Sequence, residues 1–413
     1  MTAKLPALLG GTPAFPDGLR LLRPALPPLT ALQPGLAQAF SSGVVTKGPA
    51  LAEYERRLAA LLGVKHALGV SSCTAGLMLV LDRFRPPRAA RPADEASPQP
   101  AADPVRDEVI MPSFTFMATA MAAAWAGLRP VFCDVDRETW SLDPRRAEEA
   151  ITERTAAIVP VHVFGAPADT EAFATIGERH GVPIVYDAAH GFGALRAGRP
   201  LGRDGLAQVF STSPTKLLIT GEGGVVATDD DALAERIVIG REYGNPGTYD
   251  PIFPGLNARL PEASALMGLA GLDLLEEQAQ RRNYLAALYR ESLSALPGLR
   301  FQRLRPEDRS SFKDFTVRVS ATEFGLTRDE LVAGLQAEGI ATRMYYVPPV
   351  HRTQAFATIG RRFDELLPET LTLCQEVVSL PLYGPMSDAE VERVARSVAA
   401  LQQYAPRVRA ALA

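Results

Sequence analysis

Cysteine is scarce in this chain, and long apolar runs are missing. Only Cys73, Cys133 and Cys374 occur among 413 residues, and this odd, widely spaced set suits neither a disulfide framework nor a paired-cysteine zinc site. No apolar run approaches the roughly 20 residues that span a bilayer. The first residues lack a sustained apolar core followed by a small-residue cleavage site, so a secretory signal is not expected. We therefore expect a cytoplasmic protein without a metal site.

An excess of one charge is also missing. The chain has 43 basic and 47 acidic residues, for a formal net charge of −4. The two signs are interspersed, which argues against a nucleic-acid-binding face. A length of 413 residues exceeds the roughly 250 to 300 at which a single core stops growing, so two lobes are expected. The partner that fits these observations is a small molecule.

Three segments of the chain have distinct compositions. Residues 1–40 are rich in proline, glycine and leucine, which predicts an extended arm on the body rather than a separate domain. Segment 49–63 predicts a helix between a proline and a glycine. Its apolar face is formed by Leu51, Tyr54, Leu58 and Leu61. Segment 85–104 has six prolines and little that could pack, which predicts a mobile surface insertion.

The middle of the chain alternates strand-like and helix-like runs. This alternation predicts an α/β fold with a mainly parallel sheet covered by helices on both faces. The strand-like runs are VKHALGV, EVIMP, PVFCDV, AAIVPVHVF, PIVYDAA and AQVFS. Residues 262–296 form one long helical pattern that joins the lobes, and a smaller α+β unit follows. The predicted domains are an arm over 1–40, a large domain over 41–290 and a small domain over 291–413.

Three features fall at strand ends or turns of this predicted sheet. The turn SSCTAG precedes a helix and offers backbone N–H groups to an anion; Asp187 follows a buried strand; and FSTSPTK supplies Ser211, Ser213 and Lys216. An anion cradle, a carboxylate and an amine are the groups that pyridoxal phosphate requires for its phosphate, pyridine nitrogen and aldehyde. A carboxylate against the pyridinium makes a charge-assisted hydrogen bond worth about 1.5 to 3 kcal/mol. The lysine needs a lowered pKa to present a neutral amine.

Seven segments in order resemble the DegT/DnrJ/EryC1/StrS family of sugar aminotransferases, which are pyridoxal phosphate enzymes of fold type I. The segments are SSCTAGL, PSFTFMAT, VHVFGAPAD, YDAAHGFGA, FSTSPTK with GEGG, GLNARLPEASA and MYYVPPVH. The resemblance runs nearly end to end. It implies a large domain with a mainly parallel seven-stranded sheet between helices, a smaller C-terminal α+β domain, and a homodimer with shared active sites.

The resemblance also implies a role for each matching residue. Lys216 would form the Schiff base and Asp187 would hold the pyridine nitrogen. The other cofactor contacts would be Cys73, Thr74 and Ser211 at the phosphate, Phe116 stacked on the ring, His190 near the ring hydroxyl, and Asn257 reaching the phosphate of the neighbouring subunit. Tyr346 and His351 would face the substrate, and Glu222 occupies the family's glutamate after the lysine loop.

Simpler interpretations exist for several of these residues. Asp187 could cap the turn that follows its strand, His190 could be a structural histidine, and Phe116 could belong to the core. His162 is as consistent with a structural role as with a catalytic one. The chain also departs from the family at Thr212 and Ser213, where an aromatic residue followed by histidine, tyrosine or asparagine is more usual.

The activity that the resemblance implies is a pyridoxal phosphate-dependent transamination. A keto group on a nucleotide-linked sugar or a cyclitol would become an amine, with glutamate or glutamine as the donor. One alternative is a sugar 3-dehydratase of the same family, in which a histidine replaces the Schiff-base lysine; Lys216 argues against it. The other is a non-catalytic cofactor-binding regulatory protein, since a fold does not guarantee turnover.

Overall fold

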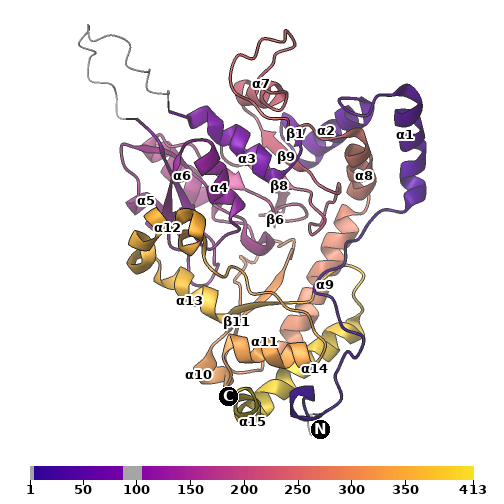
Figure 1. Ribbon diagram of the computed structural model, residues 1–413, viewed down its shortest axis with the longest axis vertical. Coiled ribbons are helices and arrows are strands. Elements are labelled where there is room, and N and C mark those ends of the chain that lie inside the picture. The colour runs from indigo at the N-terminus through magenta and orange to yellow at the C-terminus, as the bar shows by residue number, and fades with distance from the viewer. Residues whose placement is uncertain (1–3, 87–104) are drawn as a thin grey trace.

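The computed structural model describes residues 4–86 and 105–413. Most of the mobile insertion predicted for 85–104 lies outside the described residues. The chain forms a large domain, in the upper half of Figure 1, and a small domain below it that carries both ends of the chain. Within the described residues, no helix is long and apolar enough to cross a bilayer.

The large domain is built on strands that hydrogen-bond as two groups. One group has four strands in the order β1 His66–Val70, β9 Gly224–Thr228, β8 Ala207–Ser211 and β5 Val185–Asp187. The other has three, in the order β3 Arg129–Cys133, β2 Glu108–Pro112 and β4 Thr155–Ile158. A short hairpin of β6 Leu195–Arg196 and β7 Arg199–Pro200 lies apart from them.

Parallel pairing prevails in these two groups. The pairs β2–β3, β2–β4 and β5–β8 are parallel, whereas β1–β9 and β8–β9 are antiparallel. Isolated parallel bridges at Ile158–Ile184 and Val161–Asp187 connect the two groups. The predicted α/β architecture with parallel strands is therefore confirmed, while a continuous seven-stranded sheet stays a prediction. Strand β9 is not among the strands that the sequence predicts.

Helices cover both faces of the strands. On β9, Val226 packs in one apolar core, while Val225 and Ala227 pack with Tyr54 in another, because successive side chains of a strand point to opposite faces. The helices of the large domain are α2 Pro49–Leu62, α3 Cys73–Leu81, α4 Ala118–Trp125, α5 Pro144–Glu149, α6 Thr170–His180, α7 Asp231–Gly240 and α8 Glu262–Leu272.

Local signals set the ends of several of these helices. Side-chain oxygens at Ser72, Asp143, Asp169 and Asp230 accept backbone N–H groups at the starts of α3, α5, α6 and α7, as N-cap residues do. The helix predicted for 49–63 is confirmed as α2. Its buried face differs by one position, because Leu62 is buried whereas Leu61 is 40% exposed.

The long helical pattern over 262–296 is two helices rather than one. Helix α8 ends at Leu272, and α9 Leu275–Leu293 begins after a turn in which the Leu274 N–H bonds the Gly271 carbonyl. The first turns of α9 belong to a core of the large domain and its later turns to the core of the small domain. The predicted domain boundary near 290 thus falls inside α9, which runs between the two domains in Figure 1.

The small domain has an antiparallel sheet packed against helices. The strands lie in the order β10 Leu299–Phe301, β11 Phe315–Val319 and β12 Val377–Leu380. The helices are α10 Ala321–Phe324, α11 Arg328–Ala337, α13 Pro368–Glu376, α14 Asp388–Gln403 and α15 Ala405–Leu412. The short helix α12 Ala357–Gly360 packs instead on the core of the large domain. Capping boxes start α11 and α14, which fixes where each helix begins.

The N-terminal arm lies on both domains and is not extended throughout. Phe15 and Leu19 pack in the core of the small domain, and the Glu338 carboxylate accepts the Ala14 N–H at 2.7 Å. Residues 29–42 form helix α1 Leu29–Ser42, which lies beside α8 in the large domain. No residue of α1 is buried.

Candidate active site

One cavity of about 380 Å³ collects most of the predicted site residues. It lies where the carboxyl ends of β5 and β8 meet the start of α3, the place where open α/β sheets bind ligands. Its walls include Ser72, Cys73, Thr74, Phe116, Asp187, His190, Ser211, Ser213, Thr215, Lys216, Glu222, Lys313, Asp314, Tyr345 and Tyr346. We call this cavity the lysine pocket.

Asp187 is the last residue of β5, and its side chain is 4% exposed. One carboxylate oxygen accepts the Thr119 hydroxyl at 2.7 Å and the other accepts the Ala189 N–H at 3.0 Å. Burial nevertheless raises the pKa of Asp187 above its ordinary value, because a buried carboxylate is costly without a cation. A protonated pyridine nitrogen is a group that satisfies this carboxylate.

Lys216 lies on a loop that a pair of threonines closes. The Thr212 N–H bonds the Gly223 carbonyl, and the Thr220 N–H bonds the Thr212 carbonyl, each at 2.9 Å. The two threonine hydroxyls lie 2.7 Å apart and are buried. Thr212 thus holds the base of the lysine loop from within.

The electrostatic surroundings of Lys216 favour its neutral form. Burial, and then the nearby Lys313 ammonium, lower the pKa of Lys216 to about 8. At pH 7, roughly one amine in ten is then neutral, against fewer than one in a thousand for an ordinary lysine. A neutral amine is the form that condenses with an aldehyde.

An anion site faces this loop at the start of α3. The Ser72 hydroxyl caps the helix by accepting the Ala75 N–H, so the N–H groups of Cys73 and Thr74 have no carbonyl within the helix to bond. On the facing strand end, the hydroxyls of Ser211 and Ser213 lie 3.3 Å apart. Backbone donors, the helix dipole and two hydroxyls suit a phosphate group.

Gly224 brings strand β9 against the start of α3. A Cβ atom at this position would lie 2.5 Å from the Cys73 backbone nitrogen, so only glycine allows the close approach. Gly223 is similarly enclosed, since a Cβ atom there would lie 2.6 Å from the Thr212 hydroxyl and 2.4 Å from the Thr220 hydroxyl. These glycines serve packing around the loop and the helix start.

Phe116 and His190 both line the lysine pocket. Phe116 is 53% exposed, so it is not a core residue, and its ring is free to cover a planar ligand. Burial lowers the pKa of His190 well below its ordinary value, which makes the ring neutral. Its Nδ1 is buried without a hydrogen-bond partner among the described residues, as expected of a nitrogen that bonds a ligand.

Two predicted site residues lie outside the lysine pocket. His351 is fully buried, with Nδ1 2.6 Å from the Ser113 hydroxyl and Nε2 3.0 Å from the Asp364 carboxylate. Its predicted substrate-facing role is therefore corrected to one of joining the large domain to the segment after β11. Asn257 is exposed beside Glu242 on a β-bridge, and its contact with a neighbouring subunit stays a prediction.

Two other predictions concern a tyrosine and a histidine. Tyr346 lines the lysine pocket and packs against Phe114 and Phe164. His162 is fully buried away from it, accepts the Ala168 N–H at 2.9 Å and stacks on the Tyr186 ring. Burial lowers the pKa of His162 to about 4, so its ring is neutral, and its contacts are those of a packed histidine outside the lysine pocket.

Sequence reasoning missed Lys313, Asp314 and Tyr345. The segment FKDFTVRVS favours a strand, yet β11 begins at Phe315, and the two charged residues before it face the pocket. A pair of opposite charges directly ahead of an apolar strand was the available signal. Only the tertiary structure brings this part of the small domain to Lys216.

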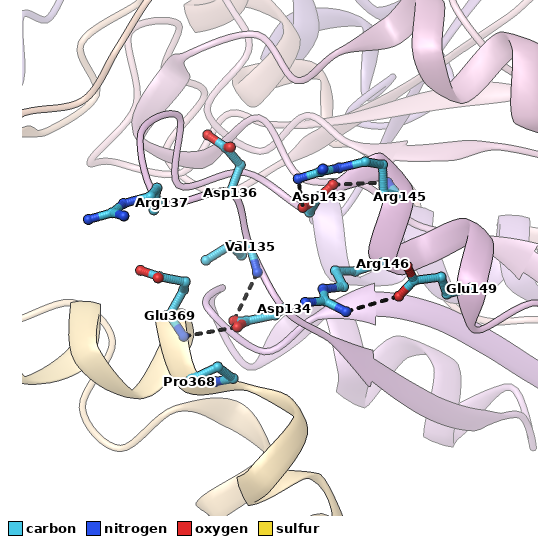
Figure 2. Close-up of a pocket in the computed structure, with 10 residues that line it drawn as sticks. All are labelled: Asp134, Val135, Asp136, Arg137, Asp143, Arg145, Arg146, Glu149, Pro368 and Glu369. Atoms are coloured by element: carbon cyan, nitrogen blue, oxygen red, sulfur yellow. Dashed lines mark hydrogen bonds and ion pairs between the residues drawn. The ribbon is translucent and has the colours of Figure 1, made fainter.

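A second cavity, of about 340 Å³, lies beside α13 and is lined by charged residues (Figure 2). Asp134 points to the start of α13 and accepts the N–H groups of Glu369 and Thr370 at 2.9 and 2.8 Å. Arg146 pairs with Glu149 at 3.0 Å. Both contacts show that Asp134 caps the start of α13. Within the described ranges, no cluster of side chains could hold a metal ion.

Comparison with known proteins identifies the family of this chain. Residues 31–399 match the model of the DegT/DnrJ/EryC1/StrS aminotransferase family. The chain belongs to this family. The spore coat polysaccharide biosynthesis protein SpsC of Bacillus subtilis (strain 168) is 32% identical over 376 residues, which cover 88% of this chain and 92% of SpsC.

Solved structures of family members have the same fold. The crystal structure of DesI in the presence of its TDP-sugar product matches with a TM-score of 0.85 and 34% identity, covering 98% of this chain and 97% of DesI. DesV of S. venezuelae, in complex with a ketimine intermediate, matches with a TM-score of 0.81 and 33% identity, covering 95% and 99% of the two chains. The protein is a pyridoxal phosphate-dependent aminotransferase.

The residues of the lysine pocket fit pyridoxal phosphate. Asp187 offers a buried carboxylate that lacks an ion-pair partner, Lys216 offers an amine with a pKa of about 8, and the start of α3 offers N–H groups to a phosphate. Each of these observations comes from the geometry of this chain. Together they match the three polar groups of the cofactor.

Proposed function

We propose that this protein transfers an amino group from glutamate or glutamine to the ketone of a nucleotide-linked sugar or a cyclitol. The observation that carries the proposal is the position of Lys216 in one pocket with Asp187 and the anion site of α3. The names of its relatives support the sugar class: DesI was crystallised with a TDP-sugar product, and SpsC belongs to spore coat polysaccharide biosynthesis.

Several residues of the lysine pocket have a defined task in this proposal. When bound, pyridoxal phosphate supplies an aldehyde that takes up the amino group and a ring that holds the electron pair freed at the neighbouring carbon. Asp187 keeps the ring nitrogen protonated through a charge-assisted hydrogen bond. Cys73, Thr74 and the hydroxyls of Ser211 and Ser213 hold the phosphate, and Phe116 excludes water from one face of the ring.

Lys216 moves the protons in both halves of the reaction. Its Nζ would take the α-proton from the amino donor and would return it to the carbon on the other side of the transferred nitrogen. The same atom runs these transfers in reverse on the sugar. One lysine therefore acts as base and as acid, and a lysine with a pKa of about 8 is suited to both roles near neutral pH.

We also propose that the enzyme works as a homodimer with shared active sites. Asn257 is exposed and outside the lysine pocket of its own chain, in the segment that resembles a dimer contact of the family. Helix α1 has no buried residue, and Phe40 on it is 79% exposed. A second copy of this chain would cover these groups and bring Asn257 to the phosphate of its neighbour.

A sugar 3-dehydratase is a weaker candidate, because the reacting position holds Lys216 and not a histidine. A regulatory protein without turnover is also weaker, because Lys216, Asp187 and Ser211 are all present in the lysine pocket. Its characteristic outcome is a purified protein that binds the cofactor covalently but reacts with no amino donor.

The proposal is tested with the purified enzyme and its cofactor. Glutamate and glutamine are each added, and the absorption band of the lysine-linked cofactor is followed; keto sugars and keto cyclitols are then screened for return of that band. The expected result is loss with one donor and recovery with a keto sugar. The matched control, Lys216→Ala, is expected to show neither step, and an alanine variant that still turns over would refute the assignment.

A further inference from the structure

Lys313 and Asp314 form a second charged pair in the wall of the lysine pocket. Both side chains are buried, each at 7% exposure, and the Lys313 Nζ lies 2.9 and 3.0 Å from the two Asp314 carboxylate oxygens. The same ammonium lies 5.3 Å from the centre of the Tyr345 ring. The proposed transamination, as described above, gives this pair no task.

Stability alone is a poor reason for such a pair. Removing two charges from water costs about as much as their attraction returns, and apolar side chains of similar volume often serve equally well. The pair also follows Phe312, whose φ of 44° is unfavourable for a side chain of this size. A role in binding a ligand in the lysine pocket explains the buried charges of Lys313 and Asp314 better than stability does.

The proposed function sets an electrostatic problem that this pair can solve. An amino donor such as glutamate carries an anionic α-carboxylate next to its reacting carbon, whereas a keto sugar presents a neutral ring there. Both reacting carbons must reach the same Lys216. The pocket therefore has to stabilise a negative charge in one half-reaction and tolerate its absence in the other.

Lys313 is the cation available for that carboxylate. Among the described residues that line the pocket, Lys216 and Lys313 are the two cationic side chains, and Lys216 is engaged at the reacting carbon. The α-carboxylate is one bond from that carbon, so its partner has to lie close to Lys216. Lys313 is close enough for its charge to contribute to lowering the pKa values of both Lys216 and His190.

We propose that Lys313 binds the α-carboxylate of the amino donor and pairs with Asp314 when the keto sugar takes its place. Asp314 then acts as a built-in substitute for the donor's carboxylate, which keeps the ammonium compensated in the second half-reaction. Lys313 is a specificity residue for the donor, and Asp314 is its positioning residue. This inference rests on the proposed function.

The test uses the holoenzyme and a variant that removes both charges at nearly constant size, Lys313→Met with Asp314→Asn. Conversion of the cofactor is followed in single turnovers with L-glutamate and with isoglutamine, the same molecule with its α-carboxylate replaced by a neutral amide. Wild type is expected to half-saturate at a lower concentration of glutamate. In the double variant, the half-saturating concentration of glutamate is expected to rise roughly ten- to 150-fold, which corresponds to the loss of one charge-assisted hydrogen bond. The half-saturating concentration of isoglutamine is expected to change little.

Two single variants separate binding from a merely structural role. Lys313→Arg keeps the charge and is expected to keep most of the preference for glutamate over isoglutamine. Asp314→Asn removes the competing carboxylate, so it is expected to lower the half-saturating concentration of glutamate and to raise that of the keto sugar. A structural role would change glutamate and isoglutamine alike, and that result would overturn the inference.

Other outcomes also decide the matter. A double variant that still prefers glutamate over isoglutamine, or one that is impaired only with the keto sugar, would overturn the assignment of Lys313 while leaving the proposed function intact. The double variant could instead react equally well with glutamate and glutamine while still disfavouring isoglutamine. That result would show that Lys313 binds the side-chain carboxylate of glutamate, and it would also overturn the inference. Wild-type enzyme that reacts with no donor would overturn both the inference and the proposed function.

Discussion

Substituting Asp187 with asparagine is expected to have opposite effects on the free and the cofactor-bound protein. In the free protein the carboxylate is buried without an ion-pair partner, and burial raises its pKa. The folded state then holds the carboxyl proton more tightly than the unfolded state does. As pH rises from the ordinary pKa of the unfolded state through the raised pKa of the folded state, ionisation of Asp187 destabilises the fold. At neutral pH, Asp187→Asn removes that cost.

The hydrogen bonds around this position tolerate the change. The Thr119 hydroxyl donates to Asp187 and also lies 3.2 Å from the Phe116 carbonyl. In the variant it can donate to that carbonyl and accept a hydrogen bond from the NH2 group of the asparagine. The remaining amide oxygen can keep the Ala189 N–H. The variant thus isolates the loss of charge from the loss of hydrogen bonds.

With cofactor present, the variant loses the charge-assisted bond to the ring nitrogen. That bond is worth about 1.5 to 3 kcal/mol, which corresponds to roughly ten- to 150-fold in affinity and in the rate of α-proton removal. Thermal unfolding is measured with and without cofactor at about pH 7.5, above the ordinary pKa of a carboxyl. We expect Asp187→Asn to raise the melting temperature of the free protein and lower that of the bound protein; a decrease or an increase in both would refute the reasoning.

Three further predictions follow from the described geometry. The rate at which the free protein captures pyridoxal phosphate should rise roughly 50-fold from pH 6 to pH 8 and level off above it, because the neutral fraction of an amine with a pKa of about 8 rises by that factor; an increase that continues to pH 10 would contradict that pKa. Gly224→Ala should abolish phosphate binding or folding, as measured by cofactor titration and circular dichroism, because its Cβ would lie 2.5 Å from the Cys73 nitrogen; unaltered affinity would refute this. His351→Ala should lower the free energy of unfolding by about 1 to 3 kcal/mol with unchanged KM for both substrates, and a rise in KM alone would restore its substrate-facing role.

The sequence allowed the centre of the site to be predicted because its groups come from short motifs. Asp187 ends β5 and Lys216 lies on the loop after β8, and the carboxyl ends of these two strands lie side by side in the sheet. Strand pairing therefore brings together what the motifs supply separately. The same reasoning could place Ser211, which ends β8.

Contacts between the domains could not be predicted in this way. Lys313 reaches the pocket because the segment before β11 lies against Phe164, whose carbonyl accepts the Lys313 N–H at 3.0 Å. His351 is the opposite case: its motif position matches the family, but its side chain is buried and hydrogen-bonds Ser113 of the large domain. No periodicity or spacing encodes either outcome, because both depend on how the cores of the two domains pack against each other.

Strand β9 and the break between α8 and α9 were missed for local reasons. The run GVVAT is five residues long and directly follows glycines, which favour a loop in a single sequence. The helix break at Asp273 and Leu274 contains no glycine or proline and leaves the helical pattern intact. In both cases packing overrides the local preference.

The most direct test of the central claim is to identify which lysine holds the cofactor. Borohydride reduction of the holoenzyme fixes the Schiff base, and peptide mass spectrometry then locates the pyridoxyl group. The account predicts the label on the peptide that contains Lys216, and its absence in Lys216→Ala. A label on Lys313, the other lysine of the pocket, or no label at all, would contradict it.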